Sequence, residues 1–200
     1  MNIDPDLTPD SERLTPSRVT RRLAYVVYIL IAKHLPATNR GRLGRMAIRS
    51  LRRWCAERMF DFCGADVNVE SGADFGKGRG ISIGSRSGIG IRARIDEPVV
   101  IGNDVMMAPD VLIFTRNHRF SRLDIPMIEQ GTTEPKLVTI GNDVWIGERV
   151  MLLPGVTIGD GAIIGAGAVV RTNIPPLAIA VGNPAVVIDY RKDRRDTRLV

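Results

Sequence analysis

Apolar residues recur at every sixth position over the second half of the chain. Between Val138 and Ile174 the first place of each six is small or β-branched, and the third is a large aliphatic residue. An amphipathic helix repeats near 3.6 residues and a half-buried strand near 2, so this period fits neither element alone. It is typical of a parallel β-helix, in which each six supplies one short strand and one turn. The third places are Ile140, Ile146, Leu152, Ile158, Ile164 and Val170.

The same frame extends upstream and is interrupted once. Ile113 and Ile140 are 27 residues apart, which is not a multiple of six, so a segment is inserted between them. The inserted residues 115–137 are polar and contain His118. The repeat predicts a β-helix over 65–190. Because long loops in compact domains are often functional, we expect the inserted loop to have a function. The upstream positions of the frame are Ile83, Ile89, Ile95, Ile101, Met107 and Ile113.

Helical patterns precede the repeat. Residues 1–16 are polar and interrupted by Pro, which predicts a loose leader. The segment 17–63 is expected to hold two helices, one ending before Pro36 and one over 40–62. The first contains the apolar run 23–32, which is too short to cross a bilayer, since a span needs about 20 residues. The favoured interpretation packs this run on the β-helix or in a subunit interface, and the alternative is peripheral attachment in the lipid headgroup region.

Charge and cysteine content limit the partners and the compartment. The formal net charge is +6, and positive charge gathers in residues 39–60 and in a basic tail over 191–200. Such clusters attract phosphates of nucleic acid, lipid or a nucleotide cofactor. Groove-reading motifs and aromatic platforms are missing, so nucleic acid is not an expected partner. Cys55 and Cys63, if on one helix, are too far apart for a disulfide, and no cleavable signal is visible, which favours the cytoplasm.

The two histidines of the chain, His34 and His118, limit the chemistry. A γ-class carbonic anhydrase shares the coil but needs three zinc-binding histidines, so that site cannot be built and no metal is expected. A histidine that titrates near neutral pH can take a proton from a hydroxyl and return it to a leaving group. His118 lies where a regular scaffold breaks to project a loop, which favours a catalytic role. A helix-end position favours a structural role for His34.

Several motifs of the repeat and loop resemble one family. They are NHRF at 117–120, IPMIEQG at 125–131, VTIGNDVWIG at 138–147, LLPGVTIGDGAIIGAGAVV at 152–170 and VGNPAVVI at 181–188. The chain resembles the hexapeptide-repeat acyltransferases, in the branch with maltose and galactoside O-acetyltransferases and polysaccharide-modifying enzymes. The resemblance implies an all-β fold, a left-handed parallel β-helix with an N-terminal α-helical extension and a C-terminal cap. It also implies a homotrimer and acetyl-CoA as the donor.

The resemblance further implies roles for individual residues. His118 matches the catalytic base, which deprotonates a sugar hydroxyl as its oxygen attacks the thioester carbonyl, with no covalent enzyme intermediate. Glu129 and Asp124 remain alternatives for the carboxylate that orients its ring. Asp96, Asn117 and Glu129 are the expected acceptor contacts. The expected donor contacts are Trp145, Gly147, Ala166, Gly167, Arg171, Thr172 and Arg191.

The expected acceptor is inferred from positions where this chain differs from the maltose and galactoside branch. Arg92 and Arg94 lie where the maltose and galactoside branch carries an acceptor-binding Asn, which disfavours simple free sugars. A nucleotide-linked, lipid-linked or polymeric sugar of bacterial polysaccharide biosynthesis is favoured, at the inner face of the membrane if the N-terminal helices bind lipid. The alternatives are acetylation of an antibiotic or a serine-like molecule, and a non-catalytic β-helix binding protein.

Overall fold

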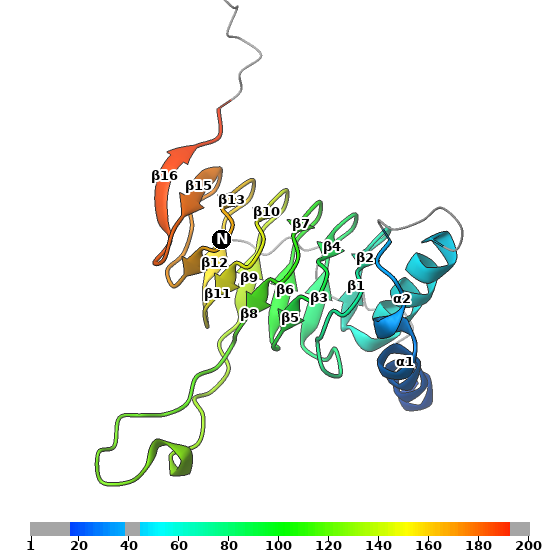
Figure 1. Cartoon of the computed structure of the whole chain (residues 1–200), viewed down its shortest axis with the longest axis horizontal. Helices are drawn as coiled ribbons and strands as arrows, with labels where there is room; N and C mark the ends of the chain where they lie inside the picture. The colour runs from blue at the N-terminus through cyan, green and yellow to red at the C-terminus, as the bar shows by residue number, and fades with distance from the viewer. Residues whose placement is uncertain (1–16, 39–44, 193–200) are drawn as a thin grey trace, which may run out of the picture.

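The main body of the molecule is a three-sided prism of short parallel strands, seen in a computed structural model that describes residues 17–38 and 45–192 (Figure 1). Neighbouring strands of each face are one full turn of the coil apart. Residues 18 positions apart, such as Thr139 and Thr157, therefore pair directly with each other. The predicted β-helix is confirmed.

Each face is a stack of short strands, and in the regular coils neighbours in a stack are three strands apart in the chain. On the second face the two N-terminal strands pair as a separate sheet. The first face contains β1 (Phe62–Cys63), β3 (Ile81–Ile83), β6 (Val99–Ile101), β9 (Val138–Ile140) and β12 (Thr157–Ile158). The second contains β2 (Asn68–Val69), β4 (Gly88–Ile89), β7 (Met106–Met107), β10 (Trp145–Ile146), β13 (Ile163–Ile164), β15 (Ala178–Val181) and β16 (Val186–Tyr190). The third contains β5 (Arg94–Ile95), β8 (Leu112–Ile113), β11 (Met151–Leu152) and β14 (Val169–Val170).

The core is a set of aliphatic columns inside the prism. On the first face Ile83, Ile101, Ile140 and Ile158 lie in register from coil to coil, and all four side chains are buried. Small buried residues such as Val144 fill the first places of the sixes. Since side chains fill the interior, the coil itself has no internal cavity for a ligand of the size of a cofactor. Binding has to use the faces, the edges or the inserted loop.

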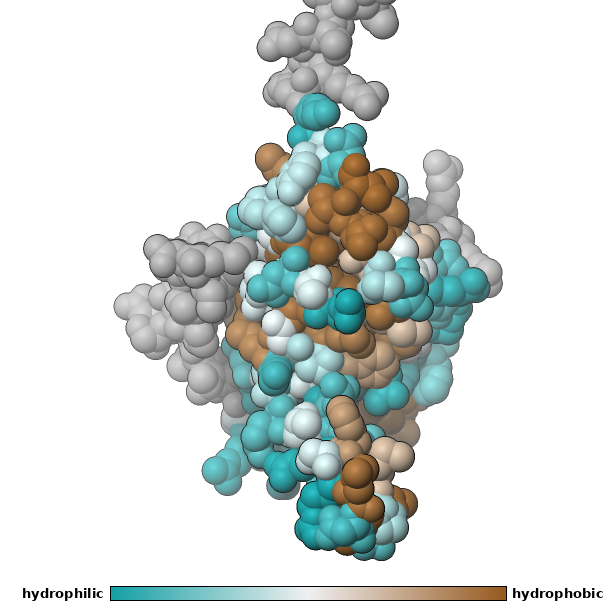
Figure 2. Space-filling view, turned by 90° about the vertical axis from the view of Figure 1, so that its left-hand side faces the viewer, coloured by the Kyte–Doolittle hydropathy of each residue, from teal (hydrophilic) through white to brown (hydrophobic). Residues whose placement is uncertain are grey.

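An antiparallel hairpin closes the C-terminal end. β15 continues the second face by pairing with β13, and β16 folds back on β15. The hairpin exposes apolar side chains, including Val186 and Ile188, which contribute to the apolar surface at this end (Figure 2). The expected cap is therefore a strand pair. Most of the expected basic tail lies outside the described residues.

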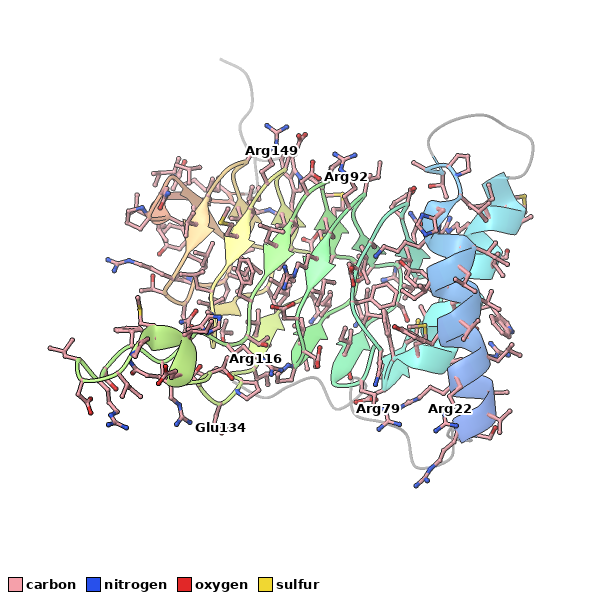
Figure 3. All side chains as sticks on the ribbon, turned by 60° about the horizontal axis from the view of Figure 1, so that its bottom comes forward. Arg22, Arg79, Arg92, Arg116, Glu134 and Arg149 are labelled. Carbon is pink, nitrogen blue, oxygen red and sulfur yellow. The ribbon has the colours of Figure 1, made fainter. Side chains whose placement is uncertain are left out.

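Helices α1 (Arg18–Leu30) and α2 (Arg45–Met59) cover the N-terminal end of the prism (Figure 1). A 3-10 turn, η2 (Ala32–His34), follows α1, so the expected first helix is split in two. Tyr28 of α1 donates its hydroxyl proton to the carbonyl of Ala73 at 2.8 Å and packs on Phe75, with ring centroids 4.5 Å apart. The helices therefore pack directly on the first coils, and Phe75 is part of this contact. Figure 3 shows Arg22 of α1 and Arg79 of the loop before β3 on the same side of this end.

The boundary between helices and prism differs from the expected one. The second helix ends at Met59 instead of 62, and Phe62 opens the first strand. Cys63 therefore lies in β1 and not on the helix of Cys55, and neither cysteine forms a disulfide. Pairing of Phe62 with Ser82, a long-range contact, overrides the local helical pattern. The expected leader over 1–16 and the start of the second helix before Arg45 lie outside the described residues. No helix in the described part of the chain is long and apolar enough to cross a membrane.

Arg52 of α2 is a fully buried cation that binds the turn after α1. Its guanidinium donates to the carbonyl of Ala32 at 2.9 Å and to the carbonyls of Leu35 and Pro36. Burial lowers the pKa of Arg52, and the Glu70 carboxylate at 3.9 Å opposes this shift. Arg52 thus supplies donors to three carbonyls of the turn, one of which, that of Leu35, also accepts from the Ser71 hydroxyl at 2.8 Å.

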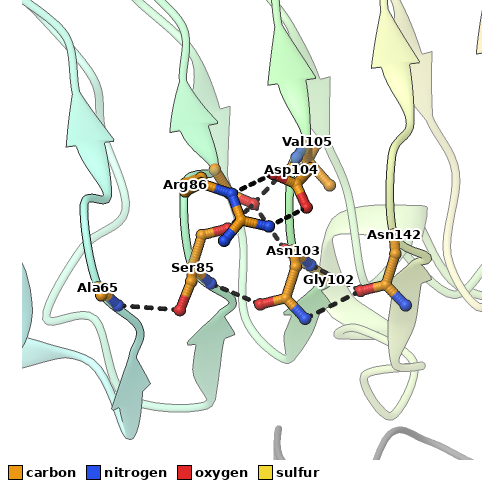
Figure 4. Close-up of polar contacts among 9 residues, drawn as sticks. Ala65, Ser85, Arg86, Gly102, Asn103, Asp104, Val105 and Asn142 are labelled. Carbon is orange, nitrogen blue, oxygen red and sulfur yellow. Dashed lines mark hydrogen bonds and ion pairs between the residues drawn. The ribbon is translucent and has the colours of Figure 1, made fainter.

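Polar side chains form a ladder along the edge that follows the first face (Figure 4). The Asn103 side-chain oxygen accepts from the Ser85 N–H at 2.7 Å, and that of Asn142 accepts from the Asn103 N–H at 2.8 Å. Asp160 accepts in the same way from the Asn142 N–H at 2.7 Å. Each coil thus satisfies a backbone donor of the coil before it, which explains why polar residues recur at this edge.

Glycine is required where two coils touch at their backbones. A Cβ atom on Gly90 would lie 2.0 Å from the carbonyl oxygen of Ala108, whereas one on Gly88 would meet nothing nearer than 3.9 Å. We expect Gly90→Ala to lower the free energy of unfolding by about 1–3 kcal/mol and Gly88→Ala to change it by less than about 0.5 kcal/mol. Urea unfolding of both variants measures the difference. Equal stability of the two would contradict the stacking described above.

The Arg52 contacts predict a second difference in stability. Arg52→Ala removes a donor from the carbonyls of Ala32, Leu35 and Pro36, of which the Ala32 bond is buried, and takes the cation away from Glu70. We expect a loss of about 3–5 kcal/mol. Arg53→Ala, the matched control on the same helix, removes partly exposed ion pairs with Glu57 and Asp66 and should cost less than about 1 kcal/mol. Thermal unfolding of the two variants provides the measurement. Similar melting temperatures would mean that Arg52 does not anchor the helices.

Candidate active site

The inserted loop, residues 115–137, forms an arm that projects from the prism between β8 and β9 (Figure 1). Its base is fixed to the coil. The buried Thr115 donates its hydroxyl proton to the Glu97 carbonyl at 2.6 Å, and the Lys136 N–H donates to the Thr115 carbonyl at 2.7 Å. The two ends of the arm therefore leave and re-enter the prism side by side.

Beyond the base, the two chains of the arm pair as an antiparallel stem. The Thr133 N–H donates to the Asn117 carbonyl at 2.8 Å, and the Arg119 N–H donates to the Gly131 carbonyl at 3.0 Å. Between these bonds His118 forms a bridge with Thr132. The backbone of His118 is therefore held in place, although its side chain is exposed.

The tip of the arm is ordered by Gln130 and exposes apolar side chains. The Gln130 amide donates to the Arg122 carbonyl at 2.8 Å and accepts from the Arg122 N–H at 3.1 Å, closing the tip around η3 (Met127–Glu129). The tip nevertheless leaves a cluster of large apolar side chains in solvent, seen at the lower end of Figure 2. These side chains are Phe120, Leu123, Met127 and Ile128.

The imidazole of His118 has no hydrogen bond or ion pair with any residue in the ranges 17–38 and 45–192. Neither expected carboxylate bonds to it. Asp124 is held by Arg122, whose guanidinium donates to its Oδ1 at 3.0 Å and lowers the pKa of the carboxyl. Glu129 is exposed on η3 and has no partner in the same ranges. Within one chain the ring is therefore free to meet an external hydroxyl, and nothing on the arm orients it.

Asp96 lies at the foot of the arm. Because Ile95 pairs with Ile113, Asp96 is level with Phe114, the last residue before the arm begins. Arg94 donates to Asp96 Oδ1 at 3.3 Å and lies over the Phe114 ring, 5.9 Å from its centroid. Figure 3 shows Arg116 at the same foot. The structure thus brings the expected acceptor contact Asp96 to the edge from which the stem with Asn117 and His118 extends.

The expected donor contacts lie on different parts of the prism. Arg171 and Thr172 follow β14, on the edge from which the arm leaves, and both are exposed. Ala166 and Gly167 are exposed on the edge that follows the second face. Trp145 lies on the second face itself and is 50% exposed. The third face separates the first two pairs, so one chain does not gather these residues into one pocket.

Two of the expected donor contacts have structural roles in the chain. Gly147 is buried, and a Cβ atom there would lie 2.6 Å from the Ala166 nitrogen, so its lack of a side chain serves coil stacking. Arg191 donates to Asp143 Oδ2 at 2.8 Å and to the Gly161 carbonyl at 2.9 Å. Its charge is therefore partly neutralised, whereas Arg171 has no side-chain partner in the described ranges.

Sequence reasoning missed Phe114, its contact with Arg94 and the apolar tip of the arm. Phe114 and Arg94 belong to the repeat by position, and their contact depends on two coils being stacked. The tip had a signal in the sequence, since Phe120, Leu123 and the Met127–Ile128 pair interrupt an otherwise polar insertion. In the described part of the chain no three acidic, histidine or cysteine side chains gather as metal ligands would.

Known proteins with the same architecture place this chain in a class. A family model described as bacterial transferase hexapeptide (six repeats) matches residues 138–172. Galactoside O-acetyltransferase of Escherichia coli K12 is 37% identical over 140 residues, which are 69% of this chain and 68% of that protein. A putative lipopolysaccharide biosynthesis O-acetyl transferase, WbbJ, of the same organism is 38% identical over 109 residues, 52% of this chain and 55% of that protein.

A solved structure extends the likeness beyond the repeats. Galactoside acetyltransferase in complex with coenzyme A superposes with a TM-score of 0.71 at 30% identity and covers 88% of this chain and 82% of the other. The shared β-helix and the similarity in sequence define the class as an acyltransferase. The chain belongs to the hexapeptide-repeat acetyltransferase family, and the expected class of acetyl-CoA-dependent O-acetyltransferase is confirmed.

Proposed function

We propose that the chain transfers the acetyl group of acetyl-CoA to a hydroxyl of a sugar unit in bacterial polysaccharide biosynthesis, with His118 as the general base. The observation that carries this proposal is the state of His118. Its backbone is fixed by the paired stem, while its imidazole is exposed and has no partner in the described residues. An unpaired imidazole on a fixed backbone suits proton transfer, because the ring can hydrogen-bond to an incoming hydroxyl.

The reaction needs one base and no covalent intermediate. The imidazole of His118 takes the hydroxyl proton as the sugar oxygen forms a bond to the thioester carbonyl carbon. The tetrahedral intermediate then breaks its carbon–sulfur bond, and the imidazolium returns the proton to the departing thiolate of coenzyme A. The products are the acetyl ester and free coenzyme A, and the histidine is neutral again.

The donor is proposed to bind along the C-terminal coils. Ala166 and Gly167 offer exposed backbone with little side chain, and a Cβ atom on Gly167 would meet nothing within 4 Å. A pantetheine arm can lie against such a surface. Arg171, beside Thr172, is the exposed cation with no side-chain partner in the described ranges and is assigned to a phosphate group. Trp145 is assigned to a wall of the donor channel, and Gly147 lets the coil of Ala166 stack closely. Arg191, which is already paired, is assigned a smaller contribution to phosphate binding than Arg171.

The acceptor is proposed to bind at the foot of the arm. Asp96 offers a carboxylate with a side chain 28% exposed, and Asn117 lies next to the base on the stem. Glu129, unpaired in the described chain, is favoured over Asp124 as the group that orients His118 or the sugar. The similarity to a putative lipopolysaccharide O-acetyl transferase supports a glycan or its precursor as acceptor. Contact of the N-terminal helices with a membrane is likewise a proposal.

The active form is proposed to be a trimer with sites shared between chains. The donor contacts occupy different edges of one prism, and the arm extends away from its own prism with an apolar tip in solvent (Figure 1, Figure 2). Side-by-side packing of three prisms would create three equivalent grooves and cover the tips. Each groove would combine His118 of one chain with a donor wall of the next.

Loss of the base should remove the chemistry and spare the structure. We expect His118→Ala to lower kcat by about 10²–10⁴-fold at saturating acceptor, since general-base catalysis contributes that much. His34→Ala is the matched control, because His34 bonds to the Ile29 carbonyl at the far end of the molecule. Transfer of label from acetyl-CoA to a panel of nucleotide sugars, lipid-linked sugars and polysaccharides measures both. Near-normal turnover of the His118 variant would refute the assignment.

Mixed oligomers test whether the site is shared. His118→Ala and Ala166→Trp should each be inactive alone, the second because it blocks the donor path. When equal amounts are unfolded and refolded together, about one quarter of the interfaces in a random cyclic trimer pair an intact histidine with an intact wall. Activity near that fraction of wild type is the expected result. No recovery in mixed oligomers verified by mass would place the whole site within one chain.

A further inference from the structure

Helix α1 presents an apolar stripe to solvent. Val19, Leu23, Val26 and Leu30 follow the spacing of one helical face and are 75%, 53%, 48% and 70% exposed. The opposite face, with the buried Ala24 and Tyr28, packs on α2 and on the first coils. The stripe is therefore not needed to fix the helix on the prism. Large aliphatic side chains aligned on one exposed face indicate a surface to which something apolar binds.

A basic pocket lies beside the start of this stripe. It has a volume of about 620 Å³ and is formed between the first turns of α1 and the glycine-rich loop 76–80. Among the residues that the structure describes, no acidic side chain lines it. Figure 3 shows two of its cations, Arg22 and Arg79, from the two walls. The lining residues are Arg18, Arg21, Arg22, Tyr25, Lys77 and Arg79.

Most of this positive charge is not neutralised by residues that the structure describes. Arg21 is 3.5 Å from Asp61 and also donates to the Arg58 and Phe60 carbonyls, so it has a structural role. The other four cations have no hydrogen bond or ion pair through their side chains in the ranges 17–38 and 45–192. Cations in the first turns of a helix also oppose its dipole, and α1 has no acidic residue there. This placement is unfavourable for the isolated helix and becomes favourable when an anion binds.

We propose that the stripe and the basic pocket form one docking surface for an anionic lipid bilayer. The helix has 13 residues and is about 20 Å long, so it fits in the membrane plane and is too short to cross. Leu23 and Val26 would enter the boundary between headgroups and acyl chains. Lipid phosphates would occupy the pocket, with Tyr25 at the polar boundary. This function is additional to acetyl transfer, and it places the enzyme where membrane-bound acceptors are.

A second copy of the chain fits this surface less well. A symmetric contact through the stripe would bring the pocket of each copy close to that of the other, with like charges at short range. A membrane surface instead offers an apolar layer beneath a sheet of phosphates, which matches the stripe and the pocket together. The position also suits this use, because α1 lies at the N-terminal end of the prism, away from the arm and the donor contacts (Figure 1).

Vesicle co-sedimentation of the full-length protein tests the proposal. One set of vesicles contains phosphatidylcholine alone, and the other contains equal parts of phosphatidylcholine and phosphatidylglycerol. We expect binding to the anionic vesicles that weakens as sodium chloride is added, and little binding to the neutral ones. Each Lys or Arg near an anionic surface raises binding about fivefold, so Arg22→Gln with Arg79→Gln should lower the partition coefficient about 25-fold. The control Arg149→Gln, on the opposite side of the prism in Figure 3, should leave it nearly unchanged.

Apolar variants test the stripe separately from the charge. Leu23→Ser and Val26→Ser should each lower binding roughly fivefold, because half-exposed aliphatic side chains would be buried on docking. Val186→Ser, an exposed apolar site on β16 at the other end of the prism, is the matched control and should bind like wild type. Circular dichroism and the molecular mass of each variant establish that its fold and oligomer are unchanged.

Three outcomes would overturn the proposal. The first is equal binding of the wild-type protein to neutral and anionic vesicles, or no binding to either. The second is normal vesicle binding by the stripe variants, together with displacement of the protein by inorganic phosphate but not by sodium chloride of equal ionic strength. That result would make the pocket a site for a small anion. The third is loss of the wild-type oligomer in the stripe variants, which would make the stripe an interface between copies. Each outcome is independent of whether His118 is the base.

Discussion

Stacking of successive coils at about 4.8 Å is the constraint on which the structure depends. Each strand residue pairs with one in the next coil, 18 positions away where the coils are regular, as Trp145 does with Ile163. Aliphatic side chains fill the space within, and small residues are required where backbones touch, as at Gly90 and Gly147. The same stacking that stabilises the prism removes any interior space for chemistry. Function is therefore restricted to what the prism carries on its outside.

The outside is used in two ways. Exposed backbone and Arg171, which has no side-chain partner among the described residues, suit a long anionic donor, and the arm carries the proposed base. The arm is stiffened by its own backbone pairs and by Gln130, so His118 is positioned without being buried. In one chain the apolar tip of the arm is exposed and the expected donor contacts lie on different edges. The proposed trimer would cover the tip and bring donor contacts of one chain close to the arm of another. The relatives named as O-acetyltransferases support the proposed chemistry.

The N-terminal helices are held to the prism by contacts that do not use their outer surface. Tyr28 and Arg52 are buried and hydrogen-bonded to backbone carbonyls, which fixes α1 and η2 against α2 and the first coils. The outward side of α1 is thereby left with apolar and cationic side chains that have no structural use in the described chain. A docking surface at this end would hold the enzyme on a bilayer while leaving the arm and the C-terminal coils accessible.

The sequence determined those features that depend on neighbours within a few residues. A period of six over sixty residues or more identifies a β-helix, because the inward and corner positions repeat locally. The break in that period locates the arm and His118. Other features were decided only by the tertiary structure, because they depend on which coil stacks on which. That Gly147 is buried under Ala166 and Arg191 is paired with Asp143 follows from contacts 19 and 48 residues apart along the chain. The end of α2 at Met59 also depends on distant residues, because Phe62 pairs with Ser82. The basic pocket does too, since Arg22 and Arg79 line it from separate segments.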